Sequence, residues 1–375
     1  MKNSFGCAVT LTLFGESHGP AVGAVLDGLA PGIPVDRQHI AACMARRRGG
    51  GPLSTPRQEQ DEVQFLSGVY QGRTTGTPLA LVLPNQKARS GDYTALRDLP
   101  RPGHADYAAR AKYQGWEDSR GGGHFSGRVT APLVAAGALC QQILAGHGIR
   151  VGTHLARCGG VPDGSFDTDA RALARQLAAL EQMQDLAVLD QDAGRAMAQA
   201  IRAAAAQGDS VGGVLETAVT GLPAGVGEPF FDSIEGVLSH LLFSIPAVKG
   251  VEFGAGFALA DWHGSRANDA FCLRDGAVAT ATNHNGGING GVSNGMPLLV
   301  RTAIKPTPSI ARPQQTIDLA AMQPAEIRIE GRHDPCILPR AAVVQSCAVA
   351  LGLVDLLTQR FGIFWQRGES ECVTV

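Results

Sequence analysis

The sequence lacks the glycine-rich fingerprints of the common nucleotide-binding folds. It contains no G-x-x-x-x-G-K-[ST] motif, and no G-x-G-x-x-G stands between a strand-like and a helix-like segment. A Rossmann-type dehydrogenase is therefore unsupported. The chain also lacks an excess of charge of one sign, since its formal net charge is −2. This balance predicts binding neither to nucleic acid nor to a membrane surface.

The sequence also lacks paired cysteines and long uninterrupted apolar runs. Its eight cysteines are scattered, no C-x-x-C occurs, and no metal-ligand spacing connects cysteine and histidine residues. No signal peptide precedes Phe5, and no apolar run is long enough to cross a bilayer without interruption. We therefore expect a cytoplasmic protein with free thiols, no disulfide framework and no metal.

The 375 residues suffice for a large core, and no linker divides them. Helix pairs alternate with strand groups without a regular βαβ repeat, so the pattern favours an α+β fold in a single domain, 1–375. Strands are expected at 9–14, 21–26, 63–66, 78–83, 209–219 and 298–304. Helices are expected at 37–48, 131–148 (buried), twice within 168–207, and at 231–243 and 340–361. Residues 84–128 show little periodicity, and so long a loop is usually functional.

Three segments place titratable side chains beside Gly, Pro and Arg. His18 lies in Gly-Glu-Ser-His-Gly, His104 lies in Arg-Pro-Gly-His-Ala-Asp, and Asp334 lies in Gly-Arg-His-Asp-Pro-Cys. One such histidine alone would favour an ordinary turn residue, but three segments together favour a functional site. Asp334 is flanked by Arg332 and His333, so we expect it to stay ionised and to be able to accept a proton. A turn salt bridge is the alternative for this segment.

Arginines also stand in glycine-rich loops. Arg46–Arg48 precede three glycines, Arg120 precedes three more, and Arg128 and Arg332 each follow a glycine. The forked guanidinium group in such loops suits carboxylates and phosphates. Helix C-terminal charge is an equal alternative for any one of the first three residues. The whole set predicts an anionic small molecule.

Two further loops carry potential ligand donors. Lys305–Ser309 follows an apolar strand, and its two prolines hold the backbone extended while Lys, Thr and Ser supply donors. The Asn- and Gly-rich segment 283–291 could wrap a planar ligand or a phosphate. Either loop by itself is more often structural.

Together these segments resemble chorismate synthases, from about Phe5 to Leu357. Enzymes of that family eliminate phosphate from 5-enolpyruvylshikimate 3-phosphate, with reduced FMN, to give chorismate in the last step of the shikimate pathway. The resemblance implies an α+β fold whose antiparallel sheets pack around and against helices. It also implies a lyase of aromatic amino acid biosynthesis that forms a homotetramer, with NADPH as a conceivable reductant.

The resemblance implies roles for individual residues. His18 would protonate the leaving phosphate, His104 would protonate reduced flavin, and Asp334 would take the C6 proton together with flavin N5. Arg47 would touch NADP or substrate, and Arg128 and Arg340 would hold the acidic groups of the substrate. Residues matching the flavin contacts of the family are His124, Phe125, Ser126, Gly290, Lys305, Pro306, Thr307, Pro308, Ser309 and Arg332.

The chain departs from the usual bacterial pattern at several of these places. His124 and Phe125 replace an Arg-Ser pair, Pro246 replaces an asparagine before Ala247, and Ser346 replaces a glutamate. The proposed catalytic residues are intact, as expected for a sub-branch of the family. Two alternatives stay open: a flavin reductase, which would not need both histidines, and a non-catalytic protein that binds flavin or a phosphorylated ligand.

Overall fold

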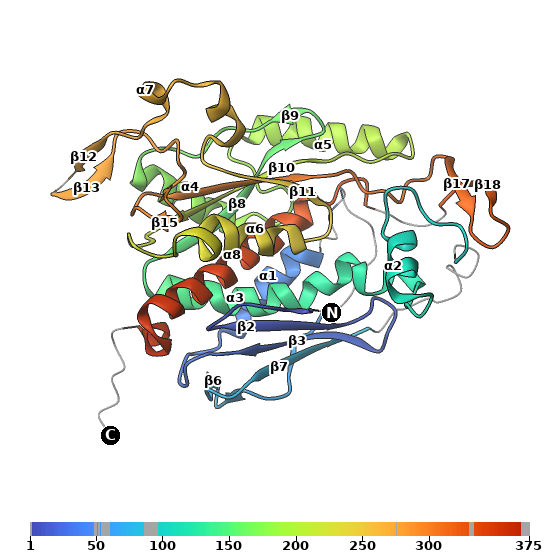
Figure 1. Cartoon of the computed structure of the whole chain (residues 1–375), viewed down its shortest axis with the longest axis horizontal. Coiled ribbons are helices and arrows are strands. Elements are labelled where there is room, and N and C mark those ends of the chain that lie inside the picture. Colours follow the sequence, from blue (N-terminus) through green and yellow to red (C-terminus); the bar gives the residue numbers. More distant parts are fainter. Residues whose placement is uncertain are drawn as a thin grey trace.

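The computed structural model describes residues 2–48, 51, 53, 61–85, 97–274, 276–329 and 334–368. Two five-stranded sheets enclose a layer of helices, and a further pair of helices lies on the outer side of one sheet (Figure 1). All strand pairs in the described residues are antiparallel. The predicted α+β class is confirmed.

The first sheet has the order β1-β2-β3-β7-β4. Its strands are β1 (Ser4–Phe5), β2 (Thr10–Gly15), β3 (Ala21–Asp27), β7 (Leu79–Pro84) and β4 (Gln64–Phe65). Val22, Ala24 and Leu26 alternate along β3 and are fully buried, because one face of the sheet meets the helices. Strands β2 and β7 end at Gly15 and Pro84, just before the segments that carry His18 and Asn85.

The second sheet has the order β11-β16-β10-β8-β9. Its strands are β11 (Val248–Phe253), β16 (Leu298–Ile304), β10 (Gly213–Thr220), β8 (Arg150–Cys158) and β9 (Val161–Pro162). Four two-stranded hairpins lie outside the two sheets: β5 (Val69–Tyr70) with β6 (Arg73–Thr74), β12 (Phe271–Arg274) with β13 (Ala277–Thr280), β14 (Ile288–Asn289) with β15 (Val292–Ser293), and β17 (Gln314–Asp318) with β18 (Gln323–Ile327). The last of these is close to α2 in Figure 1.

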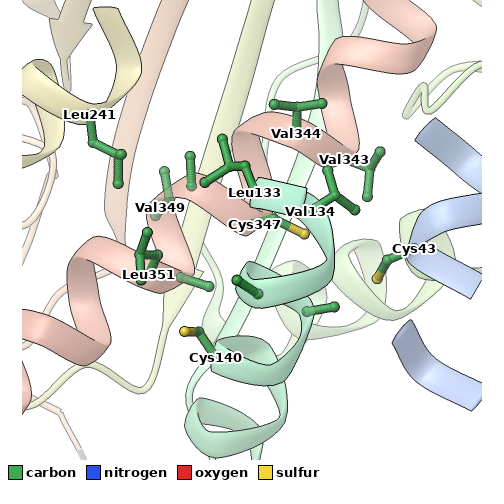
Figure 2. Packing of buried hydrophobic residues seen from close by; sticks show 14 of the residues in the cluster. Cys43, Leu133, Val134, Cys140, Leu241, Val343, Val344, Cys347, Val349 and Leu351 are labelled. Atoms are coloured by element: carbon green, nitrogen blue, oxygen red, sulfur yellow. The ribbon is translucent and has the colours of Figure 1, made fainter. Parts of the chain in front are cut away.

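The middle layer consists of α1 (Arg37–Arg48), α3 (Thr130–Gly146) and α8 (Leu338–Phe361), with α6 (Ile234–Ser244) packed on α8. In Figure 2, Leu133 and Val134 of α3 lie next to Cys347 of α8, and Leu241 of α6 lies on the other side of α8. The close approach of α3 and α8 depends on Gly137, where a Cβ atom would lie 2.5 Å from Cβ of Cys347.

The outer pair of helices is α4 (Ala170–Gln182) and α5 (Gln191–Ala206), which begin at Asp169 and Asp190, two aspartates that accept backbone N–H groups. The remaining short elements are α2 (Asp106–Tyr113), α7 (Gly264–Ala267) and the 3-10 helices η2 (Arg120–Phe125), η3 (Gly127–Val129), η4 (Phe230–Asp232), η5 (Gly256–Asp261) and η6 (Ile363–Arg367).

Two sequence-based expectations need correction. The first is that no apolar run is long enough to cross a bilayer. The segments Gly127–Gly146 and Leu338–Phe361 are long and apolar enough by length and composition, but 72% and 100% of their apolar windows are buried inside the protein. Burial between two sheets explains their apolarity. Residues 84–128 were expected to form a loop, yet they contain α2 and η2, because their helical stretches are too short to show a clear period.

Candidate active site

The three consecutive glycines of η2 lie against both predicted catalytic histidines. Gly121 and Gly122 have φ values of +61° and +89°. A Cβ atom at Gly121 would lie 2.2 Å from Cε1 of His18, and one at Gly122 would lie 3.0 Å from Cε1 of His104. Only glycine fits here, since any side chain would collide with an imidazole ring or strain the backbone. The turn therefore brings together two loops that are about 85 residues apart in the chain.

His18 is buried and its ring is held by its neighbour. The Ser17 hydroxyl lies 2.8 Å from His18 Nδ1 and 3.1 Å from the carbonyl oxygen of Arg120, to which it donates. The backbone of this loop is fixed by Asn85, whose Nδ2 donates to the carbonyl oxygens of Glu16 and Gly19. Thus the end of β7 positions the loop that follows β2.

His104 is paired with a carboxylate. Its Nδ1 lies 2.6 Å from Oδ1 of Asp106, the first residue of α2. Arg101 holds the same carboxylate through its backbone N–H, Nε and Nη2. Burial alone would raise the pKa of the Asp106 carboxyl, but the hydrogen bonds from Arg101 and His104 prevail and lower that pKa well below its usual range.

Arg47 and Arg128 share one buried carboxylate. Arg47 Nη1 donates to Asp61 Oδ2 at 2.9 Å, and Arg128 Nη1 donates to Asp61 Oδ1. The Asp61 side chain is fully buried. Arg128 Nε also donates to Asn85 Oδ1 at 2.9 Å, and Arg47 Nε donates to Thr130 Oγ1. Asn85 thereby connects this ion-paired cluster to the His18 loop.

Arg340 connects Asp334 to the same cluster. Arg340 Nη1 donates to Asp334 Oδ2, and Arg340 Nε donates to the carbonyl oxygen of Arg47 at 2.9 Å. The Asp334 side chain is 9% exposed. The structure therefore places Asp334, Arg340, Arg47 and Arg128 next to one another, although they come from three parts of the sequence.

The Lys305–Ser309 segment packs against the His104 loop. Lys305 Nζ donates to the carbonyl oxygen of Gly103, and Arg101 Nη1 reaches Ser309 Oγ at 3.4 Å. Thr307 Oγ1 is buried and has no hydrogen-bond partner among the described residues. Burial, with a smaller contribution from Lys249, lowers the pKa of the Lys305 ammonium group. Lys305 thus lies against the His104 loop, and Thr307 in the same segment keeps an unused donor.

A cavity of about 400 Å³ opens next to His104. Aromatic side chains share its wall with charged side chains of both signs. The aromatic ones are Phe14, Tyr113 and Phe125, next to His124, and the charged ones are Arg97, Arg101, Glu16, Asp106, Glu117 and Asp118. The aromatic faces suit a planar ring, and the arginines suit an anionic group on it. The histidines, the arginine cluster and this cavity together have the features of an enzyme site for an anionic substrate.

Comparisons with known proteins agree with this geometry. Residues 9–358 match the chorismate synthase family. The chorismate synthase of Thermococcus kodakarensis is 45% identical over 355 residues, covering 95% of this chain and 97% of the relative. The chain belongs to the chorismate synthase family. The chorismate synthase of Chitinophaga pinensis is 44% identical over 360 residues, covering 96% and 98% of the two chains.

The fold is that of a chorismate synthase as well. A crystal structure of a chorismate synthase superimposes with a TM-score of 0.75 at 28% identity, covering 95% of this chain and 94% of that one. The predicted resemblance, fold and enzyme class, a carbon–oxygen lyase acting on phosphates, are confirmed.

The structure gathers most of the family's predicted site residues, but not all. His124 Nδ1 lies 2.8 Å from the carbonyl oxygen of Gly15, and Phe125 is 38% exposed at the cavity. Ser126 Oγ accepts the N–H of Arg128 and caps η3. Pro308 lies near Gly103, and Pro306 lies between Lys305 and Thr307.

One predicted flavin contact, Gly290, lies apart from this group. Gly290 lies in the β14–β15 hairpin, next to the first residue of α6, whereas Lys305 follows the opposite end of β16. Among the described residues, no backbone hydrogen bond links Gly290 to the other site residues. Arg332 lies outside the described residues.

Three supporting residues were not predicted from the sequence. The side chains of Asp61, Asn85 and Asp106 each form a hydrogen bond with a predicted site residue. Asp106 stands in the quoted Arg-Pro-Gly-His-Ala-Asp segment, so its spacing from His104 was an available signal. Asp61 and Asn85 carry no local signal, because their partners are distant in sequence.

Proposed function

We propose that this chain catalyses the 1,4-elimination of phosphate and the C6 proton from 5-enolpyruvylshikimate 3-phosphate, giving chorismate with the help of reduced FMN. The observation that carries this proposal is the joining of His18 and His104 on neighbouring glycines of η2, beside Arg128. Family membership supports the same reaction and does not favour the flavin reductase alternative.

The arginine cluster binds the anionic substrate. Arg47, Arg128 and Arg340 converge on Asp61 and Asp334, so their guanidinium groups are already oriented before a ligand arrives. Forked donors of this kind match carboxylate and phosphate oxygens. An incoming anion would share these donors with Asp61, which keeps the arginines in place when the site is empty.

The proposed proton transfers use three residues: two histidines that lie against the glycine turn, and an aspartate that is paired with Arg340 of α8. His18 donates a proton to the departing phosphate, with its ring held by Ser17. His104 supplies a proton to the bound cofactor through Nε2, since Nδ1 faces Asp106. Asp334 is the proposed acceptor for the C6 proton, and its ion pair with Arg340 orients it.

The residues of the cavity and of the Lys305–Ser309 segment, which packs on the His104 loop, fit a reduced flavin. The buried, unpartnered Thr307 Oγ1 and the ammonium group of Lys305 offer donors for its phosphate or ring edge, and Phe125 and Tyr113 offer aromatic surface. Further proposed contacts are His124, Ser126, Pro306, Pro308, Ser309, Gly290 and Arg332. When bound, reduced FMN would supply electron density to the substrate without net oxidation.

We also propose a homotetramer in the cytoplasm. Phe230 and Phe231 of η4 are 88% and 94% exposed, and Phe271 on β12 is 71% exposed. Exposed aromatic side chains of this kind are typical of contact surfaces between chains. Sedimentation that gives the mass of a single chain would contradict this assembly.

The test of the activity is anaerobic incubation with 5-enolpyruvylshikimate 3-phosphate and chemically reduced FMN. Chorismate absorbance and phosphate release should rise together in equal amounts. A parallel reaction with oxidised FMN and NADPH shows whether the chain can use NADPH as reductant. Binding of both ligands without chorismate formation would favour a non-catalytic binding protein, and NADPH oxidation without chorismate would favour a reductase.

A further inference from the structure

His104 and its two partners form a closed polar unit at the start of α2. Asp106 accepts hydrogen bonds from the backbone N–H of Arg101 at 3.0 Å, from Arg101 Nε at 2.7 Å and from Arg101 Nη2 at 2.7 Å. The fourth contact of the carboxylate is His104 Nδ1, at 2.6 Å. Every contact of Asp106 is therefore to a group that can donate.

This arrangement determines which nitrogen of His104 carries the proton. An ionised carboxylate only accepts, and a guanidinium only donates. Arg101 Nη2 also lies 3.1 Å from His104 Nδ1, but the 2.6 Å contact between Nδ1 and an ionised carboxylate oxygen requires a proton on Nδ1. Nδ1 therefore keeps its proton whether the ring is neutral or cationic. Nε2, which faces Gly122 with an added Cβ atom 3.3 Å away, carries the proton that the imidazolium gives to the cofactor.

We propose that Asp106, held by Arg101, is a positioning residue that fixes the tautomer and orientation of His104 for proton transfer at Nε2. The inference rests on the catalytic role proposed above for His104. Asp106 itself does not touch the reacting atoms and acts through the imidazole.

Asp106→Asn tests the proposal, because its geometry reverses the hydrogen bond. Arg101 presents its backbone N–H and Nε to Asp106 Oδ2, so the amide oxygen of the new asparagine must take that position. The amide NH₂ then faces His104 Nδ1 and forces the proton onto Nε2. We expect kcat to fall by roughly 10²–10⁴-fold, as for other misassigned catalytic imidazoles, with the dissociation constants of substrate and FMN almost unchanged.

Two comparisons separate a positioning role from a structural one. In a His104→Ala background, Asp106→Asn should cause no further loss of kcat, whereas independent, multiplying losses would overturn the proposal. Asp98→Asn is the matched control. Asp98 forms an ion pair at 2.7 Å with Arg110, which lies on α2 like Asp106, and it touches no histidine among the described residues. This control should retain wild-type kcat. Asp106→Glu should recover part of the activity that Asp106→Asn loses.

A spectroscopic measurement tests the tautomer without relying on turnover. In protein with ¹⁵N-labelled histidine, His104 should show a protonated Nδ1 and a downfield proton signal that is absent from His104→Ala. In Asp106→Asn the proton should move to Nε2. A neutral wild-type His104 that carries its proton on Nε2 and not on Nδ1 would overturn the proposal even if chorismate is formed. If the tautomer is as predicted but the chain forms no chorismate, only the proposed function is contradicted.

Discussion

The glycine-rich loops of the site and the helical layer between the sheets are held together in opposite ways. The loops are fixed by hydrogen bonds to side chains such as Asn85 and Asp106, and close contacts are allowed by Gly121. The helical layer is fixed by apolar packing, as between Gly137 of α3 and Cys347 of α8 (Figure 2). Substitutions in the loops should therefore change catalysis, and substitutions in the layer should change stability.

The largest expected effect comes from the two histidines. His18→Ala and His104→Ala should each lower turnover by roughly 10²–10⁴-fold, because each removes a general acid. The melting temperature should change little, since both rings lie in loops outside the apolar core. Steady-state kinetics with reduced FMN and thermal unfolding measure the two quantities. Near-wild-type turnover in both variants would remove them from the mechanism.

Asp334→Asn should lower turnover by about two orders of magnitude or more while substrate and FMN still bind. The substitution keeps the size of the side chain but removes the base and weakens the ion pair with Arg340. A substrate deuterated at C6 should show a larger isotope effect than with the wild type, because proton removal becomes more rate-limiting. Normal turnover in this variant would show that Asp334 is only a turn residue and not the base.

In the helical layer, Gly137→Ala should destabilise the fold. The new Cβ would lie 2.5 Å from both Cβ and the carbonyl oxygen of Cys347, and such overpacking typically costs about 1–3 kcal/mol. Gly146→Ala is the matched control on the same helix, since nothing lies within 4 Å of its added Cβ. Denaturant unfolding should separate the two variants, and equal stabilities would contradict the packing argument. Turnover per folded molecule should be unchanged in both.

Lys305→Gln should weaken FMN binding about tenfold, the usual scale for one charge-assisted hydrogen bond. Thermal stability without ligand should change less, because the ammonium group contacts only the Gly103 carbonyl among the described residues. Titration of FMN fluorescence measures the affinity. Unchanged affinity would show that Lys305 does not contact the flavin. Arg332→Gln offers the same test outside the described residues.

The smallest expected effect is a pH dependence of stability from His154. This buried ring lies 2.7 Å from Asp163 and 3.0 Å from Glu216, with Phe166 against it. Burial lowers the pKa of His154, but the two carboxylates prevail and raise it. A raised folded-state pKa stabilises the fold at low pH, and this contribution is lost as pH rises through that pKa.

His154→Gln should therefore remove part of the decline in unfolding free energy with rising pH. Urea unfolding of both proteins from acidic to alkaline pH measures the difference. Parallel curves would show that the imidazole does not gain a proton on folding. Because the site loops share no contact with this triad among the described residues, turnover at one pH should be nearly unchanged.

Local patterns in the sequence predicted much of the fold. Alternation of apolar and Thr residues along 9–14 predicted β2, and the two helices expected within 168–207 are α4 and α5. Strand β8 was not predicted, although it is central to the second sheet, because its run from Arg150 to Cys158 mixes polar and apolar residues. His154 is buried in it only because carboxylates from two other segments meet there.

The sequence by itself determined which chemical groups are available: the histidines, the aspartate of the Arg-His-Asp-Pro-Cys segment and the arginines beside glycines. Their order and spacing were enough to indicate the family. Only the tertiary structure decided that Asp61 lies between Arg47 and Arg128, that Asn85 connects Arg128 to the His18 loop, and that η2 lies against both histidines. These contacts join residues far apart in the chain. They are set by the packing of two sheets on shared helices, which no local pattern records.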